Sequence, residues 1–329
     1  MNTSAKRKKK LMGGNFGIFV ALILMIIIFS VLNNKFFTLN NAVNIIRQVS
    51  LNGIMACGMT CVIVCGGIDL SIGAIYALAG MMTGVFMLNG VTPVAAIILG
   101  LLIGLACGVA NGLIATKLLV PPMITTLATQ FIFRGMALVI TEGGIVNLKV
   151  ATNASTYNAS IAKLLEIGSG EIGGVFPNMA AMFIIIAVIM YFLYHKTTFG
   201  FNMRAVGGNK EAAKVCGIKS DRVQIMSFAL MGLLSALSGI INIAYLKSVQ
   251  GTMGEGIEMD IIAASIIGGT SLTGGSGSIP GTIIGVFIYG VMKAGLVYIG
   301  ITSYMQKIFI GAIIIFAVTV DMMTKRRKR

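Results

Sequence analysis

Long apolar runs separated by short polar connections extend over almost the whole chain. About 20 helical residues cross the roughly 30 Å hydrocarbon core of a membrane. On that scale the pattern predicts ten membrane segments, near residues 15–32, 43–65, 71–88, 94–118, 122–140, 176–195, 222–246, 259–270, 281–299 and 304–324. The eighth segment, 259–270, is too short for a full crossing, and we expect it to be a half-helix.

Composition supports the same class. The 329 residues are 57% apolar and 11% charged, whereas a soluble domain carries about 25% charged residues. We therefore expect an all-α integral membrane protein with about ten transmembrane helices, one of them short or broken. A single transmembrane domain should cover residues 1–329.

The net charge of +15 is unevenly placed. Most of the basic residues lie in three segments, which are 1–14, 196–221 with the adjoining Arg222, and 325–329. Lys and Arg beside membrane spans favour the cytoplasmic side. Ten crossings place both termini and the 196–221 connection on one side, so all three basic segments should be cytoplasmic. The distribution of positive charge therefore indicates how the chain is oriented in a cell membrane, and it does not indicate a nucleic-acid partner.

The 196–221 connection contains a predicted short helix. Asn209 is suited to the N-cap, and Gly217 stands where a left-handed C-cap is favoured. Ala212, Ala213 and Cys216 would give this helix a face of small residues, suitable for docking into a groove of another protein. The alternative is a solvated helical loop.

Two glycine-rich stretches, 66–73 and 268–275, resemble each other at an offset of 202 residues. Glycine-interrupted spans in corresponding halves of a transporter point to its translocation path. Irregular backbone at membrane depth needs protein or a water-filled cavity around it. The path is therefore predicted to be lined by these stretches, with residues Asp69, Ser71, Gly73, Gly268, Gly269 and Gly275.

We also include two polar residues from other predicted spans among the candidates for the translocation path. Arg134 lies well inside the fifth span and needs a partner, for which Asp69 and Glu142 are the first candidates, since a buried charge is costly there. Asn111 on the fourth span can bond a neighbouring helix or a sugar hydroxyl. For each residue the alternative is a structural role, and Asp69 or Ser71 can simply cap the third span.

Catalytic and metal chemistry are not indicated. Cys57, Cys61 and Cys65 share one helix face, but the single histidine, His195, is far away in sequence, so we expect packing and no metal site. No G-x-x-x-x-G-K-[ST] motif is present to bind ATP phosphates. We expect no catalytic residues and no cofactor.

The Glu211-Ala212-Ala213 sequence, with 205–209 before it and Gly217 after it, resembles the coupling loop of ATP-binding-cassette (ABC) importer permeases. The wider chain is similar to the ribose-type sugar permease family, through motifs in order from about 45 to 321. They lie at 66–73, 110–122, 133–135, 258–260, 267–272 and 306–321. Lys293 and Lys307 depart from that pattern.

This resemblance implies a permease subunit that pairs with a second copy or a paralogue. It also implies separate cytoplasmic ATPase subunits, docked at Asn209, Glu211, Ala212, Ala213 and Gly217, and an external binding protein. The substrate implied is a monosaccharide, a ribose-like pentose or a hexose. Another small polar solute, such as a nucleoside or an autoinducer-type sugar derivative, suits the same machinery. An ion-coupled secondary transporter is the mechanistic alternative, with Asp69 as its only candidate coupling carboxylate.

Overall fold

The computed structural model describes residues 3–148, 158–302, 304–309, 311–312, 315 and 319. Its helices are α1 Thr3–Leu32, α2 Leu39–Val64, α3 Ile72–Leu88, α4 Pro93–Lys117, α5 Pro122–Ile140, α7 Asn158–Ser169, α8 Asn178–Lys196, α9 Thr198–Gly208, α10 Lys210–Val215, α11 Ser220–Leu246, α12 Ile257–Ile267 and α13 Ile279–Tyr298. The strands are β1 Ile145–Asn147, β2 Glu171–Ile172, β3 Phe176–Pro177 and β4 Ser248–Gln250.

The predicted all-α membrane architecture is confirmed for the described residues. Six helices, which are α2, α4, α5, α8, α11 and α13, are long and apolar enough to cross a membrane. The apolar parts of α1 (Phe16–Leu32) and α3 are shorter. The short eighth segment is the 11-residue helix α12. The predicted tenth segment, 304–324, and the tail at 325–329 fall largely outside the described residues.

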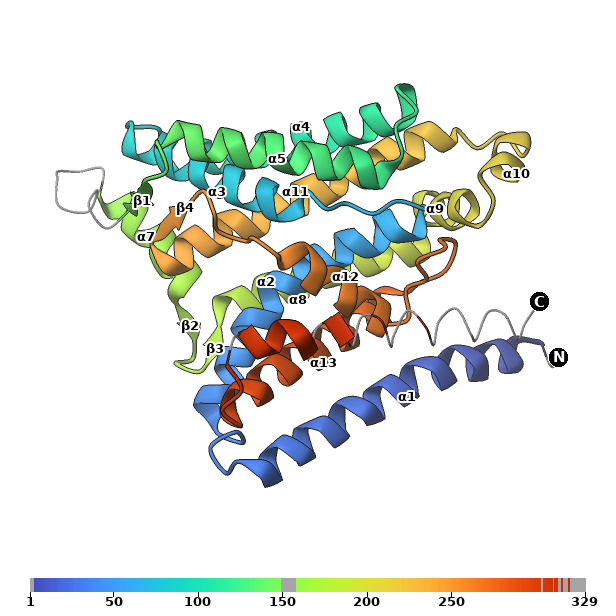
Figure 1. Cartoon of the computed structure of the whole chain (residues 1–329), viewed down its shortest axis with the longest axis horizontal. Helices are drawn as coiled ribbons and strands as arrows, with labels where there is room; N and C mark the ends of the chain where they lie inside the picture. The colour runs from blue at the N-terminus through green and yellow to red at the C-terminus, as the bar shows by residue number, and fades with distance from the viewer. Residues whose placement is uncertain are drawn as a thin grey trace.

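The helices run roughly along one common direction (Figure 1). α3, α4, α5 and α11 gather on one side, α2 and α8 lie between, and α13 and α1 form the opposite side. Large buried side chains from α2, α8, α11 and α13 form the main core, among them Met59, Tyr194, Phe228 and Tyr289.

Glycine permits very close packing of α4 against α11. A Cβ atom added at Gly104 would lie 2.6 Å from the carbonyl oxygen of Gly232, and one at Gly108 would lie 2.2 Å from that of Phe228. Small residues spaced by four allow such approach in membrane helices, where dispersion contacts replace the hydrophobic effect as the driving force. The two backbones are therefore in direct contact.

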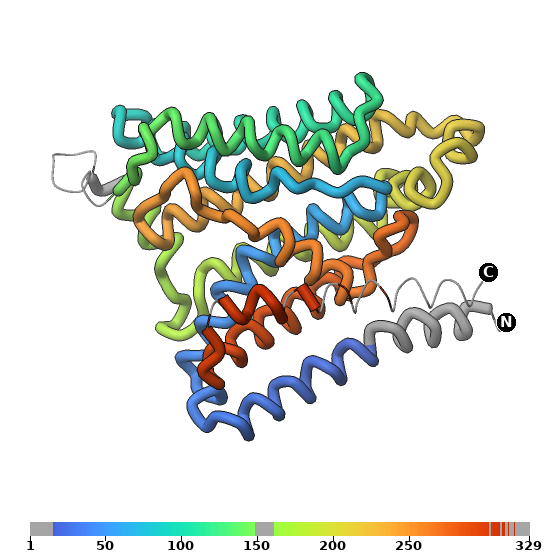
Figure 2. Tube along the Cα trace, viewed as in Figure 1, coloured from blue at the N-terminus to red at the C-terminus, as the bar shows by residue number. Residues whose placement is uncertain are grey.

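Two crossings are interrupted. α3 and α12 have 17 and 11 residues, about 25 and 16 Å at 1.5 Å per residue, so neither reaches across the bilayer alone. Non-helical chain precedes each one, at 65–71 before α3 and at 247–256, which includes strand β4, before α12. Figure 2 shows both irregular stretches between the helices.

The helices that precede the glycine-rich stretches end in the same way. After α2, Gly66 N donates to Ile63 O and Gly67 N to Val62 O; after α12, Gly269 and Thr270 make the equivalent bonds to Ile266 and Ser265. Both Gly66 and Gly269 have left-handed φ, of 87° and 86°, which is the Schellman arrangement that favours glycine. Gly66 is therefore structurally equivalent to Gly269, whereas the sequence match pairs Gly66 with Gly268.

Two small antiparallel sheets lie in connections where only loops were expected. β1 pairs with β4 through Ile145–Gln250, Val146–Val249 and Asn147–Ser248, and β2 pairs with β3. The first sheet ties the connection after α5 to the irregular chain before α12. It therefore fixes the start of the segment that leads into the second interrupted crossing.

Candidate functional site

A buried chain of hydrogen bonds begins in the irregular 65–71 segment. Asp69 Oδ1 accepts from the Ser71 backbone N–H at 2.9 Å and from Ser71 Oγ at 2.6 Å. Asn111 Nδ2 on α4 donates to Ser71 Oγ at 2.8 Å, and Thr129 Oγ1 on α5 donates to Asn111 Oδ1 at 2.7 Å. All four side chains are almost fully buried. The structure therefore brings together Asp69, Ser71 and Asn111, and it adds Thr129.

One oxygen of this network remains unsatisfied. Asp69 is fully buried, and its Oδ2 has no hydrogen-bond partner among the described residues. Ser71 occupies the N-cap position of α3 but makes no side-chain cap bond, since its hydroxyl bonds Asp69 instead. Buried polar atoms usually have partners, so the free oxygen can accept a bond from a hydroxyl-bearing ligand or a water.

The two interrupted crossings meet at Gly73. A Cβ atom at Gly73 would lie 2.2 Å from the carbonyl oxygen of Gly254 and 3.0 Å from Oε2 of Glu258. Gly73 is in the first turn of α3 and Glu258 in the first turn of α12, so two helix N-termini converge here. Both carry partial positive charge, and the buried Glu258 side chain lies at the point where they meet.

Arg134 and Gln130, one turn apart on α5, hold this second segment. Arg134 Nη1 donates to the carbonyl oxygens of Gly251 and Met253 at 2.6 and 2.7 Å, and Gln130 Nε2 donates to Glu258 Oε1 at 3.4 Å. Arg134 forms no ion pair with a carboxylate among the described residues. The expectation that Asp69 or Glu142 would be its partner is therefore wrong.

Three acidic residues, Glu255, Glu258 and Asp260, lie close together in sequence at the start of α12, but the structure places them in different environments. Glu258 is buried, with its Oε2 unsatisfied among the described residues. Asp260 forms an ion pair with Lys293 at 3.3 Å. Glu255 alone of the three is exposed, so these carboxylates do not form one shared surface for a docking protein.

Gly268, Gly269 and Gly275 lie at the opposite end of the interrupted crossing. Gly268 packs against the backbone of α13, since its Cβ would lie 2.5 Å from Gly281 O. Gly275 N donates to Val64 O at the end of α2, at 2.9 Å. Thr60 and Thr282 also share a buried hydroxyl–hydroxyl bond of 2.6 Å. The second glycine-rich stretch thus contacts the end of α2, just before the first stretch begins and away from Asp69 and Arg134.

The basic 196–221 connection contains two helices, α9 and α10, where one was expected. The predicted caps of α10 are present: Asn209 Oδ1 accepts from Ala212 N at 2.9 Å, and Gly217 has φ of 83°. Gly217 N donates to Lys214 O and Ile218 N to Ala213 O, a Schellman motif. The short helix is therefore stabilised at both ends without a partner.

The exposed face of α10 differs from the predicted one. Ala213 is only 4% exposed and packs inward, whereas Val215 is 89% exposed. Glu211, Ala212, Lys214 and Cys216 are also on the surface. Lys210 forms an ion pair with Asp221 at the start of α11, at 3.6 Å, so the helix is also fixed to the membrane segment that follows it.

Sequence reasoning missed Thr129, Gln130 and the inward orientation of Glu258. The spacing of Gln130 and Arg134, four residues apart, was an available signal, because such residues share one helix face. Nothing in the local sequence of Glu258 shows that the chain before it folds back against α3 and α5.

Comparisons with a family model and with known proteins all indicate the same family. The model described as "Branched-chain amino acid transport system / permease component" matches residues 41–318. The ribose import permease of Bacillus subtilis is 45% identical over 305 residues, which cover 93% of this chain and 92% of that protein. The ribose import permease of Escherichia coli K12 is 40% identical over 302 residues, covering 92% of each chain.

A D-allose transport system permease of Escherichia coli K12 is 36% identical over 308 residues, covering 93% of this chain and 91% of that protein. No solved structure gives a significant match. The family match spans both interrupted crossings and the α9–α10 connection, and the relatives cover nearly the whole length. The chain therefore belongs to the family of ABC importer permeases of the ribose type.

Proposed function

We propose that the chain is the membrane-spanning subunit of an ATP-driven importer for a monosaccharide, a ribose-like pentose or a related hexose. Two ribose permeases and an allose permease among its relatives support this substrate class. It works with a second permease copy or a paralogue. ATP hydrolysis takes place on separate cytoplasmic subunits, and an external binding protein delivers the sugar.

The observation that carries the proposal is the exposed, doubly capped helix α10. A six-residue helix is marginal alone, yet caps and the Lys210–Asp221 pair hold this one in place. It presents an apolar side chain, Val215, almost entirely outside the fold. An exposed, rigid element of this kind suits docking into a groove of an ATPase subunit.

The decisive experiment compares Ala212→Arg with Ala213→Arg and Thr198→Arg. Arginine at the exposed position 212 should reduce ATPase co-purification and ribose uptake at least tenfold, with the amount of folded protein unchanged. Arginine at the buried position 213 should reduce folded protein. Thr198 is exposed on the neighbouring helix α9 and should tolerate arginine. Normal ATPase binding by Ala212→Arg would exclude α10 as the docking element.

The translocation path is proposed to run along the two interrupted crossings, between this chain and its permease partner. The sites are Asp69, Ser71, Gly73, Asn111, Arg134, Gly268, Gly269 and Gly275, to which we add Gln130 and Glu258. The Glu258 carboxylate beside Gly73, the Gln130 amide bonded to it and the Arg134 guanidinium can all bond the hydroxyls of a sugar. Irregular backbone also requires polar surroundings. Residues 1–14, 196–221 and 325–329 face the cytoplasm in this proposal.

The unsatisfied carboxylate oxygens of Asp69 and Glu258 also suit ion-coupled transport. The two mechanisms differ in their energy source. Uptake that persists in a strain without the partner ATPase, and that collapses with the proton or sodium gradient, would favour ion coupling. Import of a nucleoside or a sugar derivative, in place of a free sugar, would appear in a competition assay against labelled ribose.

A further inference from the structure

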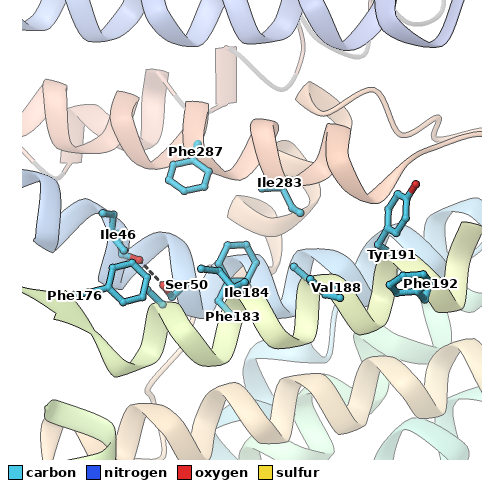
Figure 3. Close-up of a pocket in the computed structure, with 12 residues that line it drawn as sticks. Ile46, Ser50, Phe176, Phe183, Ile184, Val188, Tyr191, Phe192, Ile283 and Phe287 are labelled. Carbon is cyan, nitrogen blue, oxygen red and sulfur yellow. Dashed lines mark hydrogen bonds between the residues drawn. The ribbon is translucent and has the colours of Figure 1, made fainter. Parts of the chain in front are cut away.

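Two apolar grooves run along the membrane-facing side of α2, α8 and α13. The first, of about 530 Å³, lies between α8 and α13 with α2 at its floor, and Figure 3 shows Ile184 facing Ile283 and Phe287 across it. The second, of about 410 Å³, lies between α1, α2 and α13. Ile46 and Phe287 line both grooves, so the two grooves adjoin at these side chains, which we call the Ile46–Phe287 ridge.

The few polar side chains in the grooves are satisfied within the protein. Ser50 Oγ donates to Ile46 O at 2.6 Å, and Asn41 Nδ2 donates to Phe36 O at 2.6 Å. Thr38 caps α2 and donates to Lys35 O. Apart from the hydroxyl of Tyr191 at one end of the first groove, the walls therefore offer hydrocarbon contacts. α2, α8 and α13 have the length and composition of membrane spans, so both grooves lie at membrane depth.

A polar pocket of about 330 Å³ lies at the end of α2 from which both grooves start. It shares Leu39 with the second groove, and Asn40, Asn44, Arg47 and Glu171 line it. Arg47 and Glu171 form an ion pair, with 20% and 32% of their side chains exposed. One cation and one anion thus stand side by side, within reach of a ligand.

We propose that this composite site binds one diacyl phospholipid with a zwitterionic headgroup of the phosphatidylethanolamine type. The two acyl chains lie in the two grooves, on either side of the Ile46–Phe287 ridge. The phosphate bonds Arg47, as guanidinium favours phosphate, and the ammonium group pairs with Glu171. Arg47 lies at the end of the span remote from Lys196, so the lipid belongs to the leaflet on the Glu171 side.

The shape and the charge exclude the simpler occupants. A helix of a second chain is about 10–12 Å wide with its side chains, and the ridge divides the surface that it would need. A single-chain lipid would leave one groove empty. An anionic lipid would bring a second negative charge to Glu171, with no ammonium group to neutralise it.

The test is native mass spectrometry of the full-length chain extracted in mild detergent, with dioleoyl phosphatidylethanolamine, dioleoyl phosphatidylglycerol or lysophosphatidylethanolamine added. One phosphatidylethanolamine per chain should be retained, at least tenfold more than either other lipid. Ile184→Trp should fill the first groove and reduce retention at least tenfold. Leu102→Trp on α4 is the control, because Leu102 is 52% exposed and Ile184 is 51% exposed, and it should retain the lipid.

Glu171→Gln tests the headgroup without disturbing the apolar walls. It should lower phosphatidylethanolamine retention at least fivefold and remove the preference over phosphatidylglycerol. Equal retention by Ile184→Trp and Leu102→Trp, or an unchanged headgroup preference in Glu171→Gln, would overturn the proposal. The proposal would also be overturned if Ile184→Trp lost a bound second permease chain from its mass spectrum and did not lose a bound lipid.

Discussion

The backbone N–H of Gly275 donates a 2.9 Å hydrogen bond to the carbonyl oxygen of Val64. This bond joins the stretch after α12 to the end of α2, and Gly207 of α9 covers it. A Cβ atom at Gly207 would lie 1.7 Å from the same Val64 oxygen and 2.7 Å from Gly275 N. Both glycine-rich stretches therefore contact the helix that leads directly into α10.

The adjacent glycines 207 and 208 provide a matched pair for this contact. Gly207→Ala should destabilise the protein by about 1–3 kcal/mol, the usual cost of overpacking, because the methyl group meets backbone on two sides. Gly208→Ala should change stability by less than about 1 kcal/mol, since no atom lies within 4 Å of its Cβ position.

Thermal unfolding of these two variants can be followed with a thiol-reactive fluorophore. Cys57, Cys61, Cys65 and Cys107 are buried, so they react only when the fold opens. Cys216 is exposed and is changed to serine in the background protein. Equal thermal-unfolding midpoints for Gly207→Ala and Gly208→Ala would show that the contact of Gly207 with Val64 and Gly275 is not tightly packed.

Asp69→Asn separates the two proposed roles of this residue. Asparagine keeps an oxygen that accepts both bonds from Ser71, so expression and thermal stability should stay near those of the native protein. Ribose uptake should fall at least tenfold if the second carboxylate oxygen contacts substrate. Asp69→Ala removes the acceptor as well, and we expect a loss of about 1–3 kcal/mol because Ser71 N–H is left buried. Normal uptake by Asp69→Asn would limit Asp69 to a structural role.

Arg134→Met should release the chain before α12. Arginine makes two charge-assisted bonds to the carbonyl oxygens of Gly251 and Met253, and such bonds contribute about 1.5–3 kcal/mol each. Amide hydrogen exchange in 251–256 should accelerate roughly tenfold or more. Gln130→Met is the comparison: it removes only the 3.4 Å bond to Glu258 and should have a smaller effect. A larger effect from Gln130→Met would contradict the assignment.

Topology can be tested with the one exposed cysteine of the described residues, Cys216. In intact cells, an impermeant maleimide should leave Cys216 unmodified, and in inverted membrane vesicles it should react. Thr252→Cys, in a Cys216→Ser background, should show the opposite pattern, because Thr252 is exposed in the 247–256 segment. Labelling of Cys216 in intact cells would reverse the proposed orientation.

The helices α2 to α5, α8, α11 and α13 and the caps of α10 follow from local sequence, and the predicted ends of these helices differ little from those in the structure. Span length is set by the bilayer, and Asn209 and Gly217 determine the ends of α10 through bonds to nearby backbone. The β1–β4 pair and helix α9 were missed, since three-residue strands have almost no periodicity and the α9 sequence was read as polar connection.

The candidate site was only partly predictable because its partners are distant in sequence. Glycine and buried-charge arguments identified Asp69, Gly73 and Arg134. The partners of Arg134 are backbone carbonyl groups, which have no sequence signal at all. Ala213 was placed on the docking face because its residue type is small, but whether a small residue faces a partner or its own protein depends on how α9 and α10 fold back against α11.

The glycine contacts between α4 and α11 have a mechanical consequence. The backbones of Gly104 and Gly232 are in contact, so no layer of flexible side chains separates α4 from α11. We therefore expect the two helices to tilt together as one rigid unit. α11 alone has 27 residues, about 40 Å. Its N-terminal end is joined to α10 by the Lys210–Asp221 ion pair. Its C-terminal end continues through β4 into the segment that is hydrogen-bonded to Arg134. We propose that a displacement of α10 is transmitted through α11 to the 247–256 segment, where it would move the chain that Arg134 holds.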